Sequence, residues 1–336
     1  MKILSIQILR GGAAWLVVVH HFMQQFYNFQ DTNFIGNFFS NYGQFGVDIF
    51  FVISGFIMTF ILSNTKTDAK GFFLNRIIRI VPNYWFWTII IVIMGFFIKD
   101  LHSSDANLLS ILMSLLFIPH ENPSQLLGVY PTLSVGWTLN LEMFFYVLLS
   151  FILLFKFSSK SNILLMVGIL ILLPVVYKIF NIEFYKYVAG NLKLFEFGLG
   201  IVLYYIRDKY IVFFNSKYMI ITFLIFLLIS FMKIGAMKYI VLAGFIVYIA
   251  LRMEELIHSY RYNLIINFFV YLGEISYSTY LSHGIVLSLV YFNFVGTVHN
   301  TYLFLSYILI TILLSIMSYK IIEINFPLLL KIRKAQ

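Results

Sequence analysis

The stretch QFGVDIFFVISGFIMTFILS at residues 44–63 contains a single charged residue, Asp48. An α-helix rises about 1.5 Å per residue, so a run of this length reaches across the roughly 30 Å hydrocarbon core of a bilayer. The stretch therefore predicts a transmembrane helix. Its two glycines, Gly46 and Gly55, would allow a neighbouring helix to approach closely.

Apolar runs of similar length follow one another along the whole chain. The expected spans are 4–26, 44–63, 81–99, 134–155, 163–181, 189–206, 214–232, 239–252, 266–292 and 301–322. The run 107–118 is too short to cross a bilayer, and it predicts a re-entrant or interfacial helix. The expected fold class is therefore all-α, a polytopic membrane helical bundle of about ten transmembrane helices plus that short helix.

The composition excludes most soluble classes of protein. Hydrophobic residues make up 61% of the 336 residues and charged residues only 11%, whereas a soluble domain has about 25% charged residues. The bilayer is then the main solvent, which argues against a cytosolic enzyme, a secreted scaffold and a nucleic-acid binder. The absence of cysteine excludes disulfides and thiolate metal sites. P-loop and His-Glu-x-x-His motifs are also missing, and no metal site is expected.

The net charge of +9 predicts the orientation in the membrane. With the N-terminus inside, most Lys and Arg residues fall on the cytoplasmic side of the expected spans, as the positive-inside rule requires. An even number of spans then puts both termini in the cytoplasm. Because the chain has no Gly/Ser-rich linker, residues 1–336 are expected to form a single transmembrane domain.

The ionisable residues Arg10 and His21 lie within the first span, together with His20. A charge inside a span costs about 2.5–3.5 kcal/mol, so each is a functional candidate. At roughly 100° per residue, eleven residues make three turns plus about 20°, which places both side chains on one helix face. His20 points elsewhere. The pair predicts a polar path with a cation nearer the cytoplasm and a base farther out. The alternative is an arginine and a core histidine that hold helices together.

Two acidic residues lie near the outer ends of expected spans. Asp48 could neutralise or orient a cation, or simply face lipid headgroups. Glu142 lies in the first half of the span 134–155, close to Trp137 and one turn before Tyr146. A glutamate in this position could act as a proton partner or as a centre of hydrogen bonds.

Arg76 and Arg79 precede the third span in what is expected to be a basic cytoplasmic loop. Three residues apart on a helix, two guanidinium groups face the same way and suit the phosphates of a ligand. The alternative is an ordinary positive-inside anchor.

Polar residues recur at every third position late in the chain, at Glu274, Tyr277, Tyr280 and His283. Such a stripe is unsuited to a lipid-facing surface. It is expected to line an interior of the bundle.

Five sequence patterns together resemble the acyltransferase-3 family of membrane O-acyltransferases, most closely its exopolysaccharide and O-antigen modifying type. In family order they are Arg10-x10-His21, the run Gly46-Val47-Asp48-Ile49-Phe50-Phe51-Val52-Ile53-Ser54-Gly55-Phe56, Arg76-x-x-Arg79-Ile80-x-Pro82, Trp137-x-Leu139-x-x-Glu142-x-x-x-Tyr146 and Gly273-Glu274-x-Ser276-Tyr277-x-x-Tyr280-Leu281-x-His283. The likeness runs from residue 5 to about residue 327. Longer members carry a C-terminal SGNH-type domain, which is not expected here.

The resemblance implies transfer of an acyl group, commonly acetyl, from cytoplasmic acyl-CoA to a hydroxyl of a surface glycan. The acceptor would be O-antigen, capsule, exopolysaccharide or a lipid-linked glycan. The implied location is the bacterial cytoplasmic (inner) membrane, with membrane lipid as surroundings and no nucleic-acid partner. No permanently bound cofactor is expected, since acyl-CoA is a donor substrate.

The resemblance also implies roles for the residues singled out above. His21 would be the catalytic base or would carry the acyl group, with Arg10, Glu142 and Asp48 as further catalytic residues. Arg76 and Arg79 would bind acyl-CoA. The residues expected to bind substrate are Trp137, Tyr146, Tyr277, Tyr280 and His283. A polysaccharide polymerase, a flippase or a transporter is the alternative function, but none of them explains Arg76 and Arg79 together with the Arg10–His21 spacing.

Overall fold

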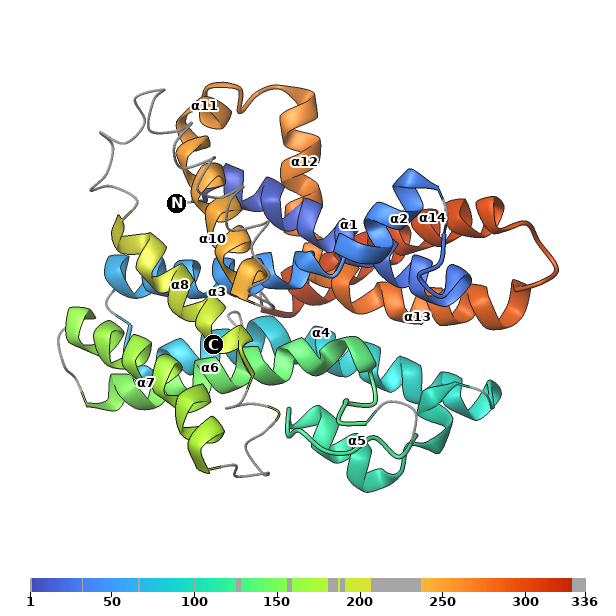
Figure 1. Ribbon diagram of the computed structural model, residues 1–336, viewed down its shortest axis with the longest axis horizontal. Helices are drawn as coiled ribbons and strands as arrows, with labels where there is room; N and C mark the ends of the chain where they lie inside the picture. The colour runs from blue at the N-terminus through green and yellow to red at the C-terminus, as the bar shows by residue number, and fades with distance from the viewer. Residues whose placement is uncertain are drawn as a thin grey trace. The chain divides into compact units, whose positions relative to one another are not determined.

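In the computed structural model, the described residues are 2–31, 33–65, 67–99, 101–124, 128–155, 159–180, 187, 191–206 and 237–327. Every regular element among them is a helix, which confirms the all-α class (Figure 1). The elements are α1 (Leu4–Tyr27), α2 (Phe34–Tyr42), α3 (Phe45–Asn64), α4 (Ala69–Phe97), η1 (His102–Asp105), α5 (Leu108–Leu115), η2 (Ser134–Gly136), α6 (Trp137–Leu154), α7 (Ser159–Phe180), α8 (Lys193–Ile206), α10 (Met237–Arg252), α11 (Glu254–Ser259), α12 (Leu264–Glu274), α13 (Ser276–Phe294), α14 (Asn300–Ser318) and the π-helix η5 (Tyr319–Asn325).

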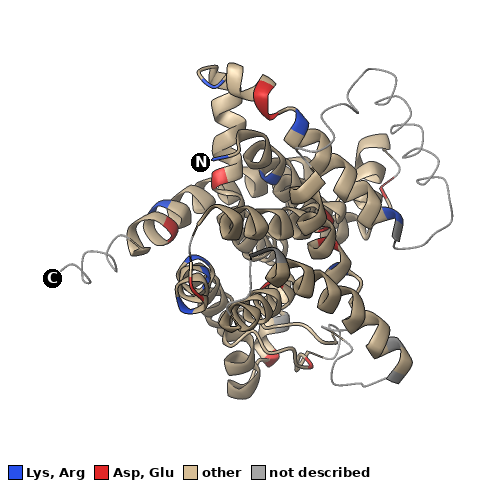
Figure 2. Cartoon of the chain, turned by 90° about the vertical axis from the view of Figure 1, so that its left-hand side faces the viewer, with Lys and Arg blue, Asp and Glu red and all other residues tan. Residues whose placement is uncertain are grey.

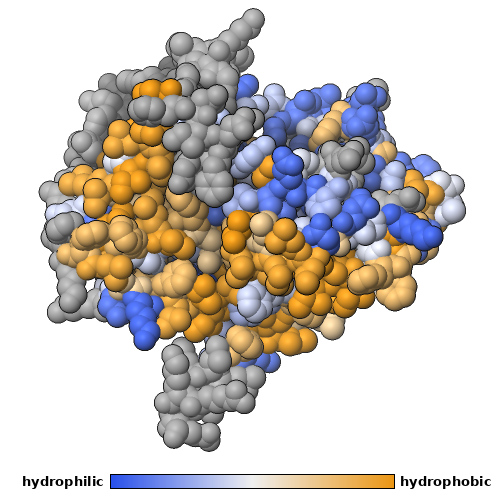
Figure 3. Space-filling model, turned by 90° about the horizontal axis from the view of Figure 1, so that it is seen from below, coloured by the Kyte–Doolittle hydropathy of each residue, from blue (hydrophilic) through white to orange (hydrophobic). Residues whose placement is uncertain are grey.

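Four helical segments among the described residues are long and apolar enough to cross a membrane. They are Phe45–Asn64, Ala69–Phe97, Ser134–Leu154 and Asn300–Asn325. Long stretches of the helices carry no charge (Figure 2), and on the face drawn in Figure 3 hydrophobic residues form a broad surface. Phe96 and Phe97 of α4 are more than 80% exposed, which suits lipid rather than water. The total of ten spans stays a prediction, and the expected span 214–232 lies outside the described residues.

The third expected span begins earlier than its hydropathy indicates. Helix α4 starts at Ala69, twelve residues before the expected boundary, and continues through Pro82. Arg76 and Arg79 therefore lie within a helix, and the expectation of a basic loop is wrong. Charged residues lower the mean hydropathy of 69–80, but the segment still buries Phe72 and Ile80 on one side of the helix.

The expected span 266–292 is two helices. Helix α12 ends at Glu274 and α13 begins at Ser276. Glu274 forms an ion pair with Lys2, and the break separates it from the helix that carries Tyr277, Tyr280 and His283. The sequence predicted one continuous polar stripe that begins at Glu274. The structure places Glu274 on a different helix from the other three residues, so this part of the prediction is wrong.

Two short helices accompany the long ones. Helix α5 confirms the helix expected within 107–118, and Asn107 and Ser110 form a capping box at its start. Two aromatic residues of α4 secure its other end: the Tyr84 hydroxyl and the Trp85 indole donate to the carbonyls of Ser114 and Leu115. Helix α2, between α1 and α3, was not expected. It is only nine residues long, and its sequence is therefore too short to predict a helix that crosses a membrane.

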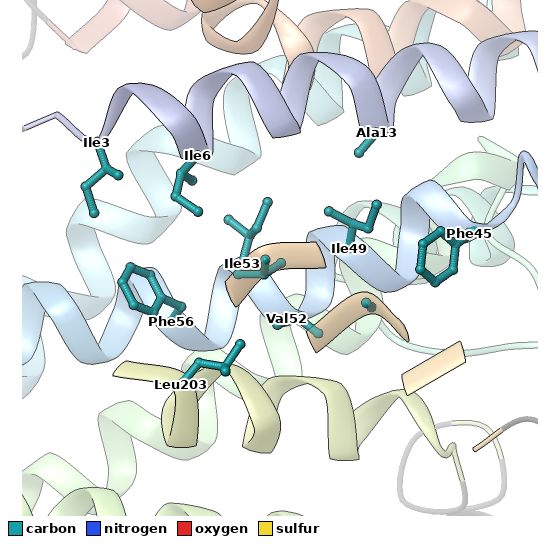
Figure 4. Packing of buried hydrophobic residues seen from close by; sticks show 11 residues of the cluster. Ile3, Ile6, Ala13, Phe45, Ile49, Val52, Ile53, Phe56 and Leu203 are labelled. Atoms are coloured by element: carbon teal, nitrogen blue, oxygen red, sulfur yellow. The ribbon is translucent and has the colours of Figure 1, made fainter. Parts of the chain in front are cut away.

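The chain forms two compact units, each assembled from separated segments. The first contains residues 1–13, 45–69 and 148–274, and the second contains residues 14–44, 70–147 and 275–336. The core of the first unit surrounds α3, whose apolar side chains meet those of α1, α8 and α10 (Figure 4). Its labelled residues are Ile3, Ile6, Ala13, Phe45, Ile49, Val52, Ile53, Phe56 and Leu203.

Helices α3 and α8 pack with their backbones in contact at two glycines. A Cβ atom at Gly55 would lie 2.0 Å from the carbonyl oxygen of Phe197, and one at Gly200 would lie 2.0 Å from that of Val52. No other residue fits at either position, since real Cβ atoms do not approach so closely. The close helix approach predicted for Gly55 is confirmed.

The core of the second unit lies where α1 meets α13 and α14. Helices α13 and α14 run side by side in Figure 1. Phe22 of α1 is buried among Val286, Val290 and Tyr307. The Tyr307 hydroxyl donates to the carbonyl of Val18 at 3.1 Å. This packing fixes the part of α1 that carries His21.

Candidate active site

Two of the predicted site residues meet in the second unit, His21 of α1 and His283 of α13. The Nδ1 atom of His21 lies 2.9 Å from the Nε2 atom of His283. The two rings are nearly parallel, with centroids 5.1 Å apart and an interplanar angle of 13°. His283 is completely buried, whereas His21 is partly exposed. A buried imidazole thus supports a second imidazole that a ligand can reach.

Tyr280 lies one turn before His283 and connects α13 to the start of α6. Its hydroxyl donates to the carbonyl of Val135 and accepts a hydrogen bond from Thr138, both at 3.0 Å. Its ring centroid lies 5.7 Å from that of His283. The hydroxyl is therefore occupied by protein partners, and the ring limits the movement of His283.

Arg76 and Glu142 are brought together around Tyr146. The guanidinium carbon of Arg76 lies 5.9 Å from the ring centroid of Phe72 and 6.0 Å from that of Tyr146, within cation–π range. The Tyr146 hydroxyl donates a 2.5 Å hydrogen bond to Oε1 of Glu142. Arg76 is partly buried, whereas Arg79 is exposed. One arginine is thus held by aromatic rings and the other faces outward.

Tyr277 joins this group from α13. Its hydroxyl donates to the carbonyl of Ile80 on α4 at 2.9 Å. It also interacts electrostatically with Glu142, Arg79 and Glu323. The second unit therefore brings together Arg76, Arg79, Glu142, Tyr146 and Tyr277, which the sequence distributes over three helices.

A buried network next to Tyr277 was largely missed from the sequence. Asn83 donates to Ser278 and to Glu323, each at 3.0 Å, and Ser318 donates to Asn83 at 2.6 Å. Ser278 also donates to Glu323 at 2.5 Å. Glu323 lies in the π-helix η5, a rare element that is frequent at functional sites. The available signal was Asn83 itself, a polar residue in the middle of an apolar run.

Asp48 has its own partners in the first unit. It forms an ion pair with Lys193 of α8, and Lys193 Nζ lies 3.3 Å from Oε1 of Glu196. The side chains of Asp48 and Glu196 are 5% and 1% exposed. The sequence did not connect these three residues, because 145 positions separate Asp48 from Lys193.

The two remaining candidates are Arg10 and Trp137. Arg10 is partly buried on α1, and α1 is continuous from Leu4 to Tyr27, as the predicted helical spacing to His21 requires. Trp137 begins α6, with its ring 6.5 Å from that of Tyr130 at 74°. Trp137 is also partly exposed, so that a ligand can reach its indole ring.

Comparison with known proteins identifies the family of the chain. A family model described as an acyltransferase domain matches residues 3–320. The exopolysaccharide production protein ExoZ of Rhizobium meliloti (strain 1021) is 43% identical over 105 residues, which are 31% of this chain and 32% of ExoZ. The chain thus aligns with about a third of the length of that relative. No solved structure matches. The family match covers nearly the whole sequence, including every site residue predicted from the sequence, and the chain belongs to the acyltransferase-3 family.

Proposed function

We propose that this chain is a membrane O-acyltransferase that moves an acyl group, commonly acetyl, from acyl-CoA to a hydroxyl of a surface polysaccharide. The observation that carries the proposal is the contact between His21 and His283 within a chain of the acyltransferase-3 family. The match to an exopolysaccharide production protein favours a polysaccharide acceptor.

His21 is the base in the proposed reaction. One ring nitrogen takes the proton of the acceptor hydroxyl, and the hydroxyl oxygen attacks the thioester carbonyl carbon. The new C–O bond forms as the C–S bond breaks, and the proton passes from His21 to the departing thiolate. The products are an ester and free CoA. The other route forms an acyl-histidine intermediate first, and acid quenching with mass spectrometry of the intact protein distinguishes the two.

Arg76 and Arg79 bind the donor in this proposal. Arg76 is held beside two aromatic rings, so its guanidinium group is already oriented for a phosphate. Arg79 is exposed and adds a charge at the surface of the same helix. The partly exposed residues Trp137 and Tyr277 are better placed to touch a glycan than Tyr280, whose hydroxyl has two protein partners.

Glu142 is the further catalytic residue of the proposal within the second unit, and catalytic roles for Arg10 and Asp48 stay sequence predictions. Glu142 accepts from Tyr146 and lies in the same electrostatic cluster as Arg79 and Tyr277. Arg10 supplies a cation on the helix that carries His21. Asp48 acts within its own ion pair with Lys193, where it contributes to the stability of α3 and α8.

The proposed sidedness follows from the charge pattern. The chain would cross the bacterial inner membrane several times, with both termini and the donor on the cytoplasmic side. Surface glycans are assembled on the other side, so the acyl group crosses part of the bilayer while CoA stays inside.

The test compares surface glycans from cells that produce the wild-type chain, a His21→Ala variant or no protein. Mass spectrometry should find acyl-modified glycan only with the wild-type chain. A His258→Gln variant is the matched control, because His258 is an exposed histidine outside the site. Glycans that are identical with and without the wild-type chain would reject the proposed function.

A further inference from the structure

We propose that His283 is a positioning residue that fixes the tautomer of His21, so that Nε2 of His21 is the nitrogen that takes the proton. This inference rests on the proposed function for its catalytic meaning. The assignment of protons itself follows from hydrogen bonds within the second unit.

The first step concerns the proton on His283. Its Nδ1 atom lies 3.3 Å from the carbonyl oxygen of Thr279, one turn earlier on α13. A carbonyl oxygen can only accept a hydrogen bond. Nδ1 of His283 therefore carries a hydrogen and donates it. Because His283 is completely buried, bulk water does not compete for this position.

The second step passes this assignment on to His21. A neutral imidazole with a hydrogen on Nδ1 has a lone pair on Nε2. That Nε2 atom lies 2.9 Å from Nδ1 of His21. Nδ1 of His21 must then be the donor. The remaining nitrogen of His21, Nε2, has no hydrogen and is free to act as a base.

The opposite arrangement requires a charged His283. With hydrogens on both nitrogens, His283 would donate to His21 and would reverse the tautomer of His21. The hydrogen-bond partners of His283 are His21 and the backbone of Thr279 and Tyr280, and none of them is a carboxylate. A completely buried cation without an anionic partner is costly. The geometry therefore favours the neutral form.

The same contact serves during the reaction. When Nε2 of His21 takes the proton of the acceptor hydroxyl, Nδ1 keeps its hydrogen and its bond to His283. That bond becomes charge-assisted and stronger. The hydrogen bond between the two nearly parallel rings and the Tyr280 ring beside His283 keep His283 in place while the charge forms.

A direct test reads the tautomers by NMR. The full chain, labelled with ¹⁵N in its seven histidines, is examined in detergent micelles at a pH where its histidines are neutral. Spectra that correlate ring carbon-bound protons with ring nitrogens separate protonated from unprotonated nitrogens. We expect His21 to have its hydrogen on Nδ1, with signals assigned through the His21→Gln variant. A hydrogen on Nε2 of His21 would overturn the proposal. The NMR measurement does not depend on activity. It therefore determines the tautomer of His21 even if acyl transfer is never detected.

A second test separates positioning from simple packing. In His283→Gln, the side-chain amide oxygen can replace Nε2 as acceptor, whereas His283→Leu fills space without an acceptor. We expect the leucine variant to lower kcat by about 100-fold with an unchanged KM for acyl-CoA, and the glutamine variant to stay within about tenfold of wild type. Equal losses in the two variants would overturn the proposal. If the leucine variant does not fold, the NMR result on the wild-type chain decides.

Discussion

The Tyr146 hydroxyl donates a 2.5 Å hydrogen bond to Glu142, one turn earlier on α6, while the ring of the same tyrosine lies 6.0 Å from the guanidinium carbon of Arg76. One side chain thus contacts a carboxylate through its oxygen and a cation through its ring. The two contacts can be removed separately.

Tyr146→Phe keeps the ring and removes the hydroxyl. We expect the free energy of unfolding to fall by about 1–3 kcal/mol, because the partly buried Glu142 loses a donor, while affinity for acyl-CoA changes little. Tyr146→Leu removes the ring as well, and we expect weaker donor binding because Arg76 loses a cation–π contact of about 0.5–2 kcal/mol. Thermal unfolding in detergent and a CoA binding assay provide the two measurements. Equal donor affinity in both variants would contradict the role of the ring.

Replacing both Arg76 and Arg79 by alanine should weaken acyl-CoA binding by at least about tenfold, since each such factor corresponds to about 1.4 kcal/mol. The loss should shrink at high salt, because the exposed charge of Arg79 is screened. Arg76→Lys keeps the charge but loses the planar guanidinium group, and we expect part of the loss to remain. Lys70→Ala is the control, since Lys70 is exposed on the same helix. Unchanged affinity for acyl-CoA in the double variant would mean that these arginines only fix the orientation of the helix in the membrane.

His21→Ala should lower acyl transfer by about 100- to 10,000-fold in a chain that still inserts and folds. His20→Ala should be much milder in activity, because His20 Nδ1 donates to the carbonyl of Phe39 on α2 and so serves structure. Its cost should appear as a loss of about 1 kcal/mol in stability. Transfer assays and unfolding curves on the two purified variants make the comparison. Equal loss of activity in both would remove the special role of His21.

Lys193→Met should strongly destabilise the first unit. Asp48 and Glu196 are almost completely buried, and removing Lys193 leaves buried acidic groups without their cation, a loss of about 3–5 kcal/mol. Neutralising all three residues, with Asp48→Asn and Glu196→Gln added, should recover much of this loss. Thermal unfolding in detergent measures both. A single variant as stable as wild type would show that the ion pairs contribute nothing.

Single cysteines can test the proposed sidedness, because the chain has none of its own. Asp68→Cys should react only with reagents that enter the cytoplasm, and Glu121→Cys with impermeant reagent added outside to spheroplasts. Both positions are exposed, whereas the neighbouring Asn122 is buried and donates to the carbonyls of Tyr130 and Pro131. The reverse labelling pattern would invert the donor and acceptor sides.

Sequence patterns predicted the helices whose apolar runs are continuous. The span expected at 44–63 is the helix Phe45–Asn64, and the first span, 4–26, is Leu4–Tyr27. The start of α4 could not be predicted, because hydropathy alone does not show that a charged segment buries one side. The break at Ile275 could not be predicted either, because Gly273 two residues earlier lies in a run whose hydropathy continues across it.

The candidate residues could be chosen from the sequence, but their partners could not. Helical periodicity relates residues within one element, such as Arg10 and His21. The hydrogen bond between His21 and His283 joins positions 262 residues apart, and only the packing of α1 on α13 creates it. For the same reason the sequence could not show that His283 contacts His21, Thr279 and Tyr280, and its expected role in substrate binding stays a prediction.

The glycine contacts between α3 and α8 also have a mechanical consequence. At Gly55 and Gly200 the backbones touch directly, without side chains that could change rotamer to absorb a displacement. Sliding or rotating one helix against the other would drive main-chain atoms into each other. The two helices should therefore move as one rigid body. Any change in the shape of the first unit during turnover has to occur where helices meet through side chains instead.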